Sequence, residues 1–483
     1  MKNQVFISSK RRKAEVNKNV YGHFAEHLGR CIYEGFWVGE DSPIPNVRGI
    51  RKDIIEALKA LNIPVLRWPG GCFADNYHWR DGIGPRKNRK KTINIHWGNV
   101  IEDNQFGTHE FFDLCEMLNC DAYINANVGS GTVAEMRDWF EYMTYDGDST
   151  LASERRKNGR KKPWDVKWFG IGNENWGCGG NMRPEFYADL YRQYRTYIRG
   201  DAKKIACGAN DFDYNWTDVL MKTAAGHMDA LSLHFYTLPT QNWSSKGKAT
   251  NFPKEEWTRT LDRCKKMDEI IRGHCTIMDK YDPNKRVELL VDEWGTWYDV
   301  EEGTNPGFLY QQNSIRDACV AAVTFHIFHK HAERVTMANI AQTVNVLQAM
   351  ILTDGEKMLR TPTYHVFEMF KHHQDAWTLD CIEQEMSEFV SSSVTKKNDT
   401  IFISLCNYGL DKTENIIFEH EDGNFVADSA EGYALIGNKT DDHNTFENPD
   451  KVKKNLFNGY KAEGGKITIT APPMSVITIS LKV

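Results

Sequence analysis

The chain has 483 residues, a formal net charge of −6, 41% hydrophobic residues and 26% charged residues of both signs. This length accommodates one large domain and a smaller one, and the apolar fraction is sufficient for a sizeable core. The charge balance argues against a nucleic-acid-binding protein, which needs a basic face. No run of about 18 apolar residues occurs, so no membrane span is expected.

Cysteine usage and the first residues of the chain bear on the cellular compartment. The eleven cysteines are scattered, odd in number and form no CxxC pair, which favours reduced thiols over a disulfide framework. The opening sequence MKNQVFISSKRRKAEVNKN has no apolar stretch typical of a signal peptide. A cytoplasmic location is therefore expected.

Short apolar or β-branched runs alternate with segments of 3.6-residue periodicity through most of the chain. The strands are expected at residues 20–26, 65–68, 122–127, 166–172, 204–209, 229–235, 287–292 and 335–339. The helices are expected at 51–61, 108–118 with Thr108 as the N-cap, 184–198, 255–281 and 314–331.

Eight strands alternating with helices predict an α/β fold of the (β/α)₈ TIM-barrel type. A doubly wound open sheet is the alternative, and it usually carries a glycine-rich phosphate turn after its first strand. Here the first strand is followed by EHLGRCIYEG, which is not a GxGxxG turn. The barrel is therefore the favoured fold.

Near residue 375 the pattern changes to alternating apolar and polar residues, most clearly at 401–405, 466–470 and 475–483. Turn-rich stretches such as 419–424 separate these strands, which predicts an antiparallel β-sandwich. The N-terminal QVFIS at 4–8 precedes the barrel and could pair into the same sheet. The expected domains are a catalytic barrel at 15–373 and a sandwich at 374–483 that includes strand 1–14.

Two strands of the expected barrel end in glutamates in similar sequence contexts. The fourth ends in GNENW, which contains Glu174, and the seventh ends in VDEWG, which contains Glu293. Catalytic groups of such barrels lie at the carboxyl ends of the strands. Two carboxyls facing each other there are the groups that cleave a glycosidic bond, one protonated and one ionised. A single glutamate of this kind is more often a surface or salt-bridge residue, but the matched pair favours catalysis.

The first strand contains His23, Glu26 and His27 in the pattern HxxEH, which also occurs in zinc peptidases. That motif requires a helix, so that both histidines lie on one face, and a third ligand from a later helix. Here it follows a β-like run, so the zinc peptidase is only a remote alternative. We expect Glu26 to be a third carboxylate at the barrel mouth that holds sugar hydroxyls.

Two further residues are expected to act on the carboxylates. Arg67 begins the motif RWPGGCF at the end of the second strand, and a buried arginine needs a carboxylate partner such as Glu293 or Glu26. Tyr236 ends the sixth strand in HFY, where its hydroxyl could hydrogen-bond the nucleophile and lower its pKa.

The motifs GHFAEHLGR, RWPGGCF, GNEN, SLHFY, DEWGTWY and ANIAQTVNVL together resemble glycoside hydrolase family 51, the α-L-arabinofuranosidases. The resemblance extends over essentially the whole chain, in order. It implies a (β/α)₈ barrel with a C-terminal β-sandwich and cleavage with retention of anomeric configuration.

By the same resemblance, Glu174 is the general acid/base and Glu293 is the nucleophile. The resemblance also implies an arabinose pocket and an aromatic loop after the second strand. The pocket residues are Glu26, Arg67, Asn173, Tyr236, Gln342 and Trp297, and the loop residues are His96 and Trp97.

This chain departs from the family at two places. Many members have Asn where this chain has Cys72, and the loop after Glu174 reads Trp176-Gly177-Cys178-Gly179-Gly180. We expect Cys72 and Trp176 to be among the substrate-binding residues. Cys72 and Cys178 are expected to lie close together, either as a disulfide beside the pocket or as two unrelated buried thiols.

The resulting hypothesis is an exo-acting, retaining α-L-arabinofuranosidase that needs no cofactor or metal. Its substrates would be arabinan, arabinoxylan or derived oligosaccharides, and the resemblance suggests a homo-oligomer, often a hexamer. The alternatives are an endo-glucanase or β-xylosidase on the same barrel, and a non-catalytic sugar-binding protein. The last would need aromatic residues but not two facing carboxylates.

Overall fold

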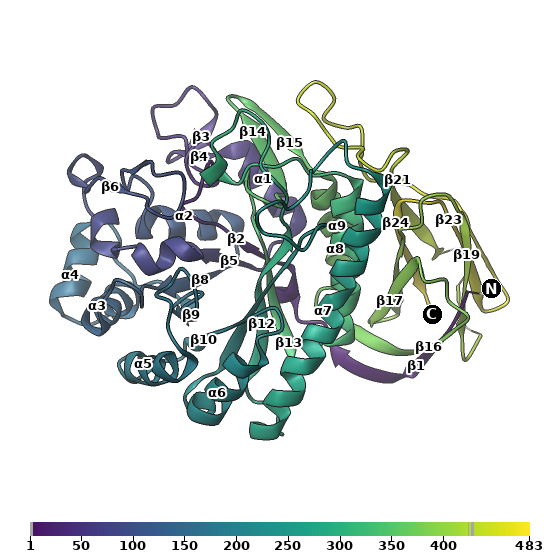
Figure 1. Ribbon diagram of the computed structural model, residues 1–483, viewed down its shortest axis with the longest axis horizontal. Helices are drawn as coiled ribbons and strands as arrows, with labels where there is room; N and C mark the ends of the chain where they lie inside the picture. The colour runs from purple at the N-terminus through teal and green to yellow at the C-terminus, as the bar shows by residue number, and fades with distance from the viewer. Residues whose placement is uncertain (1–2, 424, 427–428) are drawn as a thin grey trace.

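The computed structural model describes residues 3–423, 425–426 and 429–483. The expected segments 1–14 and 419–424 therefore each extend into residues outside this description. The molecule consists of a barrel surrounded by helices and a β-domain that lies beside it (Figure 1).

Eight parallel strands close into the barrel, which confirms the predicted TIM-barrel class and excludes an open doubly wound sheet. Each strand is hydrogen-bonded to two others, and the last pairs with the first to complete the ring. In chain order the strands are β2 (Gly22–Phe24), β5 (Val65–Trp68), β8 (Asp121–Ala126), β9 (Val166–Ile171), β10 (Lys203–Asn210), β11 (Ala230–Thr237), β12 (Glu288–Thr296) and β13 (Val335–Ile340).

The helices surround the barrel and connect successive strands (Figure 1). They are α1 (Lys52–Leu61), α2 (Thr108–Leu118), α3 (Val133–Thr144), α4 (Thr150–Lys157), α5 (Pro184–Thr196), α6 (Tyr214–Ala224), α7 (Lys254–Tyr281), α8 (Ile315–Lys330) and α9 (Pro362–Phe370). Short 3₁₀ helices are η1 (Lys18–Tyr21), η2 (Cys72–Asn76), η3 (Trp79–Gly82), η4 (Arg86–Asn88), η5 (Ala225–His227), η6 (Pro306–Phe308) and η7 (Lys371–His373). Helices α3, α4, α6 and α9 lie in segments where no helix was predicted.

Two local predictions were wrong. Thr108 is the first residue of α2, and Gly107 is its N-cap. The Thr108 hydroxyl accepts a hydrogen bond from Trp139 Nε1, so it is not the capping group. The strand expected at 20–26 is shorter, because Val20 lies in η1 and only β2 has strand geometry.

The interior of the barrel is filled by side chains from seven of its strands. This layer consists of Val65, Tyr123, Trp168, Ile205, Ala230, Leu290 and Met337, and all seven are buried. Inward-facing residues fill small barrels of this kind as a packed layer. The barrel is therefore closed below the site, and substrate can reach the functional side chains only from the open mouth.

The β-domain is a separate antiparallel sandwich, as predicted, although β1 and β19 within it run parallel. Its strands form one continuous sheet in the order β21-β20-β24-β18-β17-β16-β1-β19-β23-β22, which encloses a second apolar core. They are β1 (Gln4–Glu15), β16 (Trp377–Gln384), β17 (Val390–Lys397), β18 (Thr400–Asn407), β19 (Glu414–His420), β20 (Glu431–Ile436), β21 (Asn455–Leu456), β22 (Tyr460–Glu463), β23 (Lys466–Ala471) and β24 (Ser475–Lys482).

Three small two-stranded sheets lie in the loops. They pair β3 (Asn46–Val47) with β4 (Ile50–Arg51), β6 (Thr92–Ile93) with β7 (Ile101–Glu102), and β14 (Ile351–Asp354) with β15 (Lys357–Arg360). The β6–β7 hairpin carries the expected aromatic loop and lies near the barrel mouth, as described below.

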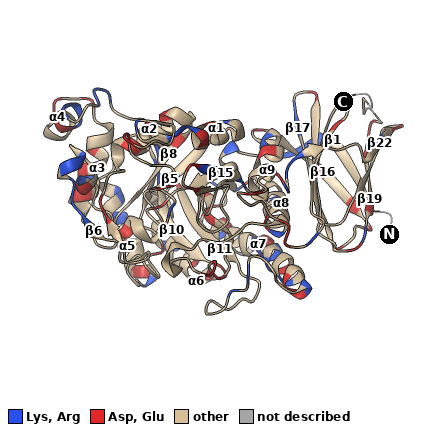
Figure 2. Ribbon diagram, turned by 90° about the horizontal axis from the view of Figure 1, so that it is seen from above, with Lys and Arg blue, Asp and Glu red and all other residues tan. Residues whose placement is uncertain are grey.

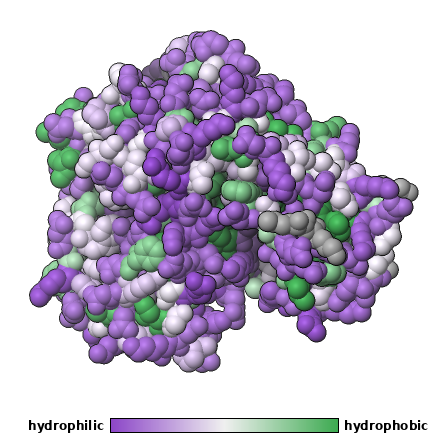
Figure 3. Space-filling view, turned by 45° about the vertical axis from the view of Figure 1, so that its right-hand side comes forward, coloured by the Kyte–Doolittle hydropathy of each residue, from purple (hydrophilic) through white to green (hydrophobic). Residues whose placement is uncertain are grey.

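The surface is hollowed between the barrel and the sandwich (Figure 3). A cavity of about 640 Å³ lies at this junction between α8 and strands β16 and β17. His326 and His329 line it, and their ring nitrogens are hydrogen-bonded to Ser391 and Ser393 of β17. None of the predicted catalytic residues lines this cavity.

Lys and Arg positions are interspersed with Asp and Glu positions along the ribbon of both parts of the molecule (Figure 2). Nucleic-acid binding needs a basic face, and this mixture of signs does not favour it. Within the described part of the chain, no helix combines the length and the apolar run needed to cross a membrane.

Candidate active site

The two predicted catalytic glutamates meet at the mouth of the barrel but lie in different backbone settings. Glu293 lies within β12, which continues to Thr296, and pairs with His234 of β11. The β11–β12 register shifts between Ser232 and His234, and such irregularities redirect side chains near active sites. Glu174 lies in the turn after β9, at a left-handed φ of 44°.

Glu293 is buried and held by hydrogen-bond donors on both of its oxygens. Arg67 Nη1 donates to Oε1 at 3.0 Å, and the Tyr236 hydroxyl donates to Oε2 at 2.8 Å. Burial raises the pKa of Glu293 to about 7, although His234 and Arg67 oppose this rise. The two donors also fix the direction of the carboxylate, which a nucleophile requires.

His234 lies between three carboxylates. Its Nδ1 is 2.8 Å from Glu174 Oε1 and 3.5 Å from Glu293 Oε2, and its Nε2 is 3.0 Å from Asp292 Oδ1. Burial opposes protonation, but Glu293, Asp292 and Glu174 together raise the pKa of His234 to about 10. This raised pKa favours the cationic form of the ring at neutral pH, and the ring lies between Glu174 and Glu293.

Asp292 contacts Tyr123 and Arg67 in addition to His234. Tyr123 donates to its Oδ2 at 2.8 Å, and Arg67 Nε lies 3.5 Å from the same oxygen. Burial opposes ionisation of Asp292, but Arg67, His234 and Tyr123 outweigh it and lower its pKa. Asp292 is thus an ionised counter-charge that holds both cations in place.

The Glu174 side chain lies beside the two cysteines that set this chain apart. The structure joins Cys72 and Cys178 in a disulfide with a Cα–Cα distance of 5.5 Å. Their sulfurs lie 3.8 Å and 3.5 Å from Glu174 Oε2. A sulfur in a disulfide carries no proton and cannot donate a hydrogen bond. In these two contacts only a protonated Glu174 could be the hydrogen-bond donor. The Glu174 side chain is 17% exposed and the Glu293 side chain is 7% exposed.

Glu26 forms a third buried carboxylate at the mouth. Its Oε1 accepts hydrogen bonds from the Phe73 amide and from Trp97 Nε1, at 3.0 Å and 2.9 Å. Its Oε2 accepts a hydrogen bond from Gln342 Nε2 at 2.8 Å. Burial raises the pKa of Glu26 against these donors. Asn173 also lies at the mouth of the barrel, where its Oδ1 accepts a hydrogen bond from Arg67 Nη2 at 2.5 Å.

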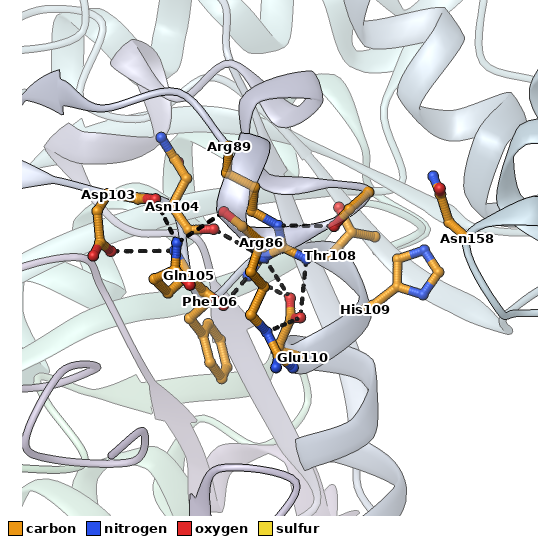
Figure 4. Close-up of polar contacts among 12 residues, drawn as sticks. Arg86, Arg89, Asp103, Asn104, Gln105, Phe106, Thr108, His109, Glu110 and Asn158 are labelled. Atoms are coloured by element: carbon orange, nitrogen blue, oxygen red, sulfur yellow. Dashed lines mark hydrogen bonds and ion pairs between the residues drawn. The ribbon is translucent and has the colours of Figure 1, made fainter. Parts of the chain in front are cut away.

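The hairpin that carries Trp97 has an anchored base (Figure 4). Arg89 forms a two-pronged ion pair with Glu110 of α2 and donates to the Asn104 and Gln105 carbonyls. Arg86 binds the same Glu110 carboxylate at 3.2 Å. At the other end of the hairpin, a Cβ on Gly98 would lie 2.7 Å from the Phe308 ring of η6.

Three other predicted residues have less direct contacts. Trp297 packs edge-on against Tyr236 with ring centroids 4.9 Å apart, so it borders the site through that tyrosine. Trp176 donates its indole N–H to the Gly208 carbonyl of β10. His96 is half-buried beside Trp97, and no contact among the described residues joins it to the catalytic glutamates.

The histidines of the HxxEH segment do not converge. His23 lies in β2, packs against the Phe367 ring and has its pKa lowered to about 3 by burial. His27 accepts from Trp68 Nε1 at 3.1 Å and contacts Glu102 through Nδ1 at 2.9 Å. Within the described ranges, neither histidine belongs to a group of side chains close enough to share a metal ion. The segment therefore lacks the geometry of a zinc-peptidase motif.

Four residues that support the site were not predicted from the sequence. His234 could have been found, because it lies two residues before Tyr236 in a motif already quoted and alternate residues of a strand share a face. Asp292 is adjacent to Glu293, so the same rule places the two side chains on opposite faces and gives no signal for Asp292. Tyr123, in the middle of β8, and Asp75, in η2, gave no such signal. Their partners are distant in sequence and only the fold brings them together.

The separation of the Glu174 and Glu293 carboxylates indicates the class of reaction. One oxygen of Glu174, one of Glu293 and one ring nitrogen of His234 all lie within 4.8 Å of one another. Retaining glycosidases hold their carboxyls about 5–5.5 Å apart, whereas inverting enzymes need about 6.5–9.5 Å to admit water. A TIM barrel with two such carboxylates at its mouth defines the protein as a glycoside hydrolase of the retaining type.

Comparisons with known proteins place the chain within this class. The family models described as Alpha-L-arabinofuranosidase 1 domain and Alpha-L-arabinofuranosidase C-terminal domain match residues 57–255 and 292–475. An intracellular exo-α-L-arabinofuranosidase of Bacteroides ovatus is 52% identical over 99% of this chain and 95% of its own length. The chain belongs to the α-L-arabinofuranosidases of glycoside hydrolase family 51.

Two solved structures show the same fold. The GH51 arabinofuranosidase of Xanthomonas axonopodis pv. citri is 47% identical, with a TM-score of 0.97 and all of both chains covered. The arabinose complex of the Thermotoga maritima α-L-arabinofuranosidase is 28% identical, with a TM-score of 0.85, and covers 99% of this chain and 100% of that one.

Proposed function

We propose that this protein is an exo-acting, retaining α-L-arabinofuranosidase in which Glu293 is the nucleophile and Glu174 is the general acid/base. The observation that carries the assignment of roles is the difference between the two carboxylates. Glu293 is buried and receives hydrogen bonds from Arg67 and Tyr236, whereas Glu174 lies in a more exposed turn. A nucleophile must be directed and ionised, and an acid/base must exchange protons with leaving group and water.

The first step breaks the glycosidic bond. Glu293 attacks the anomeric carbon of a terminal arabinofuranosyl unit and forms a covalent ester, while the proton on Glu174 passes to the departing oxygen. The carboxylates of Glu174, Glu293 and Asp292 surround His234. The Arg67 guanidinium is a second cation and lies beside Glu293 and Asp292. One proton on these carboxylates balances the negative charge that the two cations leave, and the proposed acid role requires that proton on Glu174.

The second step releases arabinose. Glu174, now ionised, removes a proton from water, and the resulting oxygen attacks the anomeric carbon and displaces Glu293. Two displacements on opposite faces restore the original configuration. The cations His234 and Arg67 hold Glu293 as a leaving carboxylate in this step.

Substrates are arabinose-containing glycans, and we propose arabinan, arabinoxylan or their oligosaccharides. Glu26, Asn173 and Gln342 offer acceptors and donors for sugar hydroxyls beside the catalytic pair. Two contacts of the β6–β7 hairpin favour cleavage at chain ends. Trp97 donates a hydrogen bond to Glu26, and Gly98 packs against the Phe308 ring. In this proposal the hairpin and η6 close the pocket beyond Glu26, so only a terminal sugar fits.

The experiment that tests this function is product analysis on branched arabino-oligosaccharides, with aryl xyloside and cellulose as alternative substrates. Release of single arabinose units with retained configuration supports the proposal. Release of internal fragments, or faster hydrolysis of the xyloside or of cellulose, would favour the β-xylosidase or endo-glucanase alternative.

Four further features remain part of the proposal. We propose a catalytic domain at 15–373, a sandwich at 374–483 with strand 1–14, a homo-oligomeric assembly such as a hexamer, and a cytoplasmic location. The name of the Bacteroides ovatus relative supports the last of these. Sedimentation analysis tests the oligomeric state.

A further inference from the structure

Asp75 links three segments at the mouth of the barrel and has no part in the reaction just described. It belongs to η2, directly after the Pro-Gly-Gly turn, and is buried. Its Oδ1 accepts from the amides of Val128 and Gly129 at 2.6 Å and 2.8 Å. Asp75 thus joins η2 to the loop that follows β8.

The other oxygen of Asp75 faces the turn that contains Glu174. Asp75 Oδ2 accepts from the Asn173 amide at 2.8 Å and from Asn175 Nδ2 at 3.2 Å. These two residues flank Glu174 in the sequence. The carboxylate therefore holds the turn on both sides of the acid/base.

This turn needs such support because of its backbone conformation. Glu174 has a φ of 44°, and a non-glycine residue in the left-handed region persists only where its surroundings fix it. No strand pairing holds Glu174, since β9 ends at Ile171. Within the turn its carbonyl accepts hydrogen bonds from the Gly177 and Gly179 amides, but its side chain and its two neighbours need further contacts. The hydrogen bonds of Asn173 and Asn175 to Asp75 lie on both sides of this strained residue.

Close packing leaves Asp75 little freedom to move. A Cβ on Gly179 would lie 2.4 Å from Asp75 Oδ2 and 2.1 Å from the Asn173 carbonyl. On the opposite side, a Cβ on Gly129 would lie 2.9 Å from Asp75 Cβ. The absence of side chains at both glycines lets the two loops close on the carboxylate.

We propose that Asp75 is a positioning residue for Glu174, which fixes the acid/base at the distance from the leaving oxygen that proton transfer requires. This inference rests on the proposed role of Glu174. It assigns to Asp75 an effect chiefly on acid catalysis, because Asp75 contacts the turn of Glu174 directly, whereas Glu293 is held by Arg67 and Tyr236. The side chain of Asn173 is the link between that turn and Arg67.

The test compares Asp75→Asn with the wild type on two substrates. Asparagine has the same shape, but its amide nitrogen cannot accept from the backbone amides that the carboxylate serves. Methyl α-L-arabinofuranoside needs a proton on its leaving oxygen, whereas the 2,4-dinitrophenyl arabinofuranoside does not. We expect kcat/KM to fall about 100-fold for the methyl glycoside and less than about threefold for the dinitrophenyl glycoside.

Asn127→Ala is the matched control. Asn127 Oδ1 accepts from the Ser130 and Gly131 amides at 2.9 Å, and its Nδ2 donates to the Tyr77 carbonyl. It thus supports the same loop after β8, and none of these bonds reaches the turn of Glu174. Asn127→Ala should lower the melting temperature but change both substrates by the same factor. Equal losses on both substrates for Asp75→Asn would overturn the proposal.

Asn175→Ala serves if Asp75→Asn does not fold. It removes one hydrogen bond to Asp75 Oδ2 and one to the Gly179 carbonyl, so a selective loss of about tenfold on the methyl glycoside is expected. An equal change on both substrates overturns the inference here as well. Glu174→Ala provides the reference, because a non-selective loss in that variant would overturn the proposed acid/base role itself.

Discussion

Glu293 and Glu174 differ in how the chain holds them. Glu293 lies in a barrel strand, its backbone is fixed by two neighbouring strands, and its carboxylate is fixed by Arg67 and Tyr236. Glu174 lies in a turn with a left-handed φ, and both of its neighbours in the sequence bind Asp75. Its carbonyl also accepts hydrogen bonds from the Gly177 and Gly179 amides. A nucleophile benefits from rigidity and burial, whereas an acid/base must meet a leaving group on one step and water on the next.

The largest effect should follow removal of the nucleophile. Glu293→Ala should lower kcat by about 10⁴-fold or more on every arabinofuranoside, because no covalent ester can form. Single-turnover hydrolysis of an aryl arabinofuranoside measures this. Glu293→Gln preserves the shape of the side chain and should be equally inactive, and substantial turnover by either variant would exclude the assigned role.

Removal of the acid/base should give a smaller and more selective effect. Glu174→Ala should lower kcat/KM by about 10²–10⁴-fold for alkyl and sugar leaving groups, but much less for a dinitrophenyl group. Hydrolysis of the ester should become rate-limiting, and azide should accelerate it as a substitute nucleophile. Equal losses on all substrates without azide rescue would contradict the contrast between the two glutamates.

Loss of one donor to the nucleophile should shift the pH profile. Burial raises the pKa of Glu293 to about 7, and Glu293 must be ionised to attack, so activity should fall as pH falls through that region. Tyr236→Phe removes a hydrogen bond to the ionised form. The acidic limb of the kcat/KM profile should therefore move up by about one pH unit. At pH values below this limb, kcat/KM of the variant should be about tenfold lower than that of the wild type. An unchanged limb would show that Tyr236 does not tune Glu293.

The smallest effect on catalysis should come from the disulfide. Cys72–Cys178 connects η2 to the loop after Glu174 across a sequence separation of 106 residues. Cys178→Ser should lower the melting temperature by about 5 °C, since the bond restricts the unfolded chain. It should change kcat/KM for the methyl glycoside by less than about tenfold, because Asp75 still holds the turn. Scanning calorimetry of the variant measures this shift. Calorimetry of the wild type, with and without a dithiol reductant, provides the matching comparison.

The sequence was most informative where a residue and its structural setting are close along the chain. The positions of the eight barrel strands were predicted to within a few residues, because buried parallel strands are apolar runs bounded by turns. The short apolar–polar alternation also indicated the strands of the sandwich correctly. The N-cap of α2 was assigned to Thr108 instead of Gly107, because the partner of the Thr108 hydroxyl is Trp139 of another helix.

The site was less accessible to such reasoning. Glu174 and Glu293 were found through motifs near the ends of two predicted strands, whereas His234 was not among the predicted site residues. Its cationic state depends on Asp292, Glu174 and Glu293 together. No pattern along the chain contains that combination.

Local periodicity and motifs near strand ends were enough to predict the fold class, the family and the two glutamates proposed to be catalytic. The donors to Glu293, the place of His234 between Glu174 and Glu293, and the contacts of Asp75 with the turn of Glu174 are seen only in the folded protein. Closure of the barrel is the physical reason, because it brings the ends of β5, β9, β11 and β12 to one mouth and lets charges more than a hundred residues apart interact.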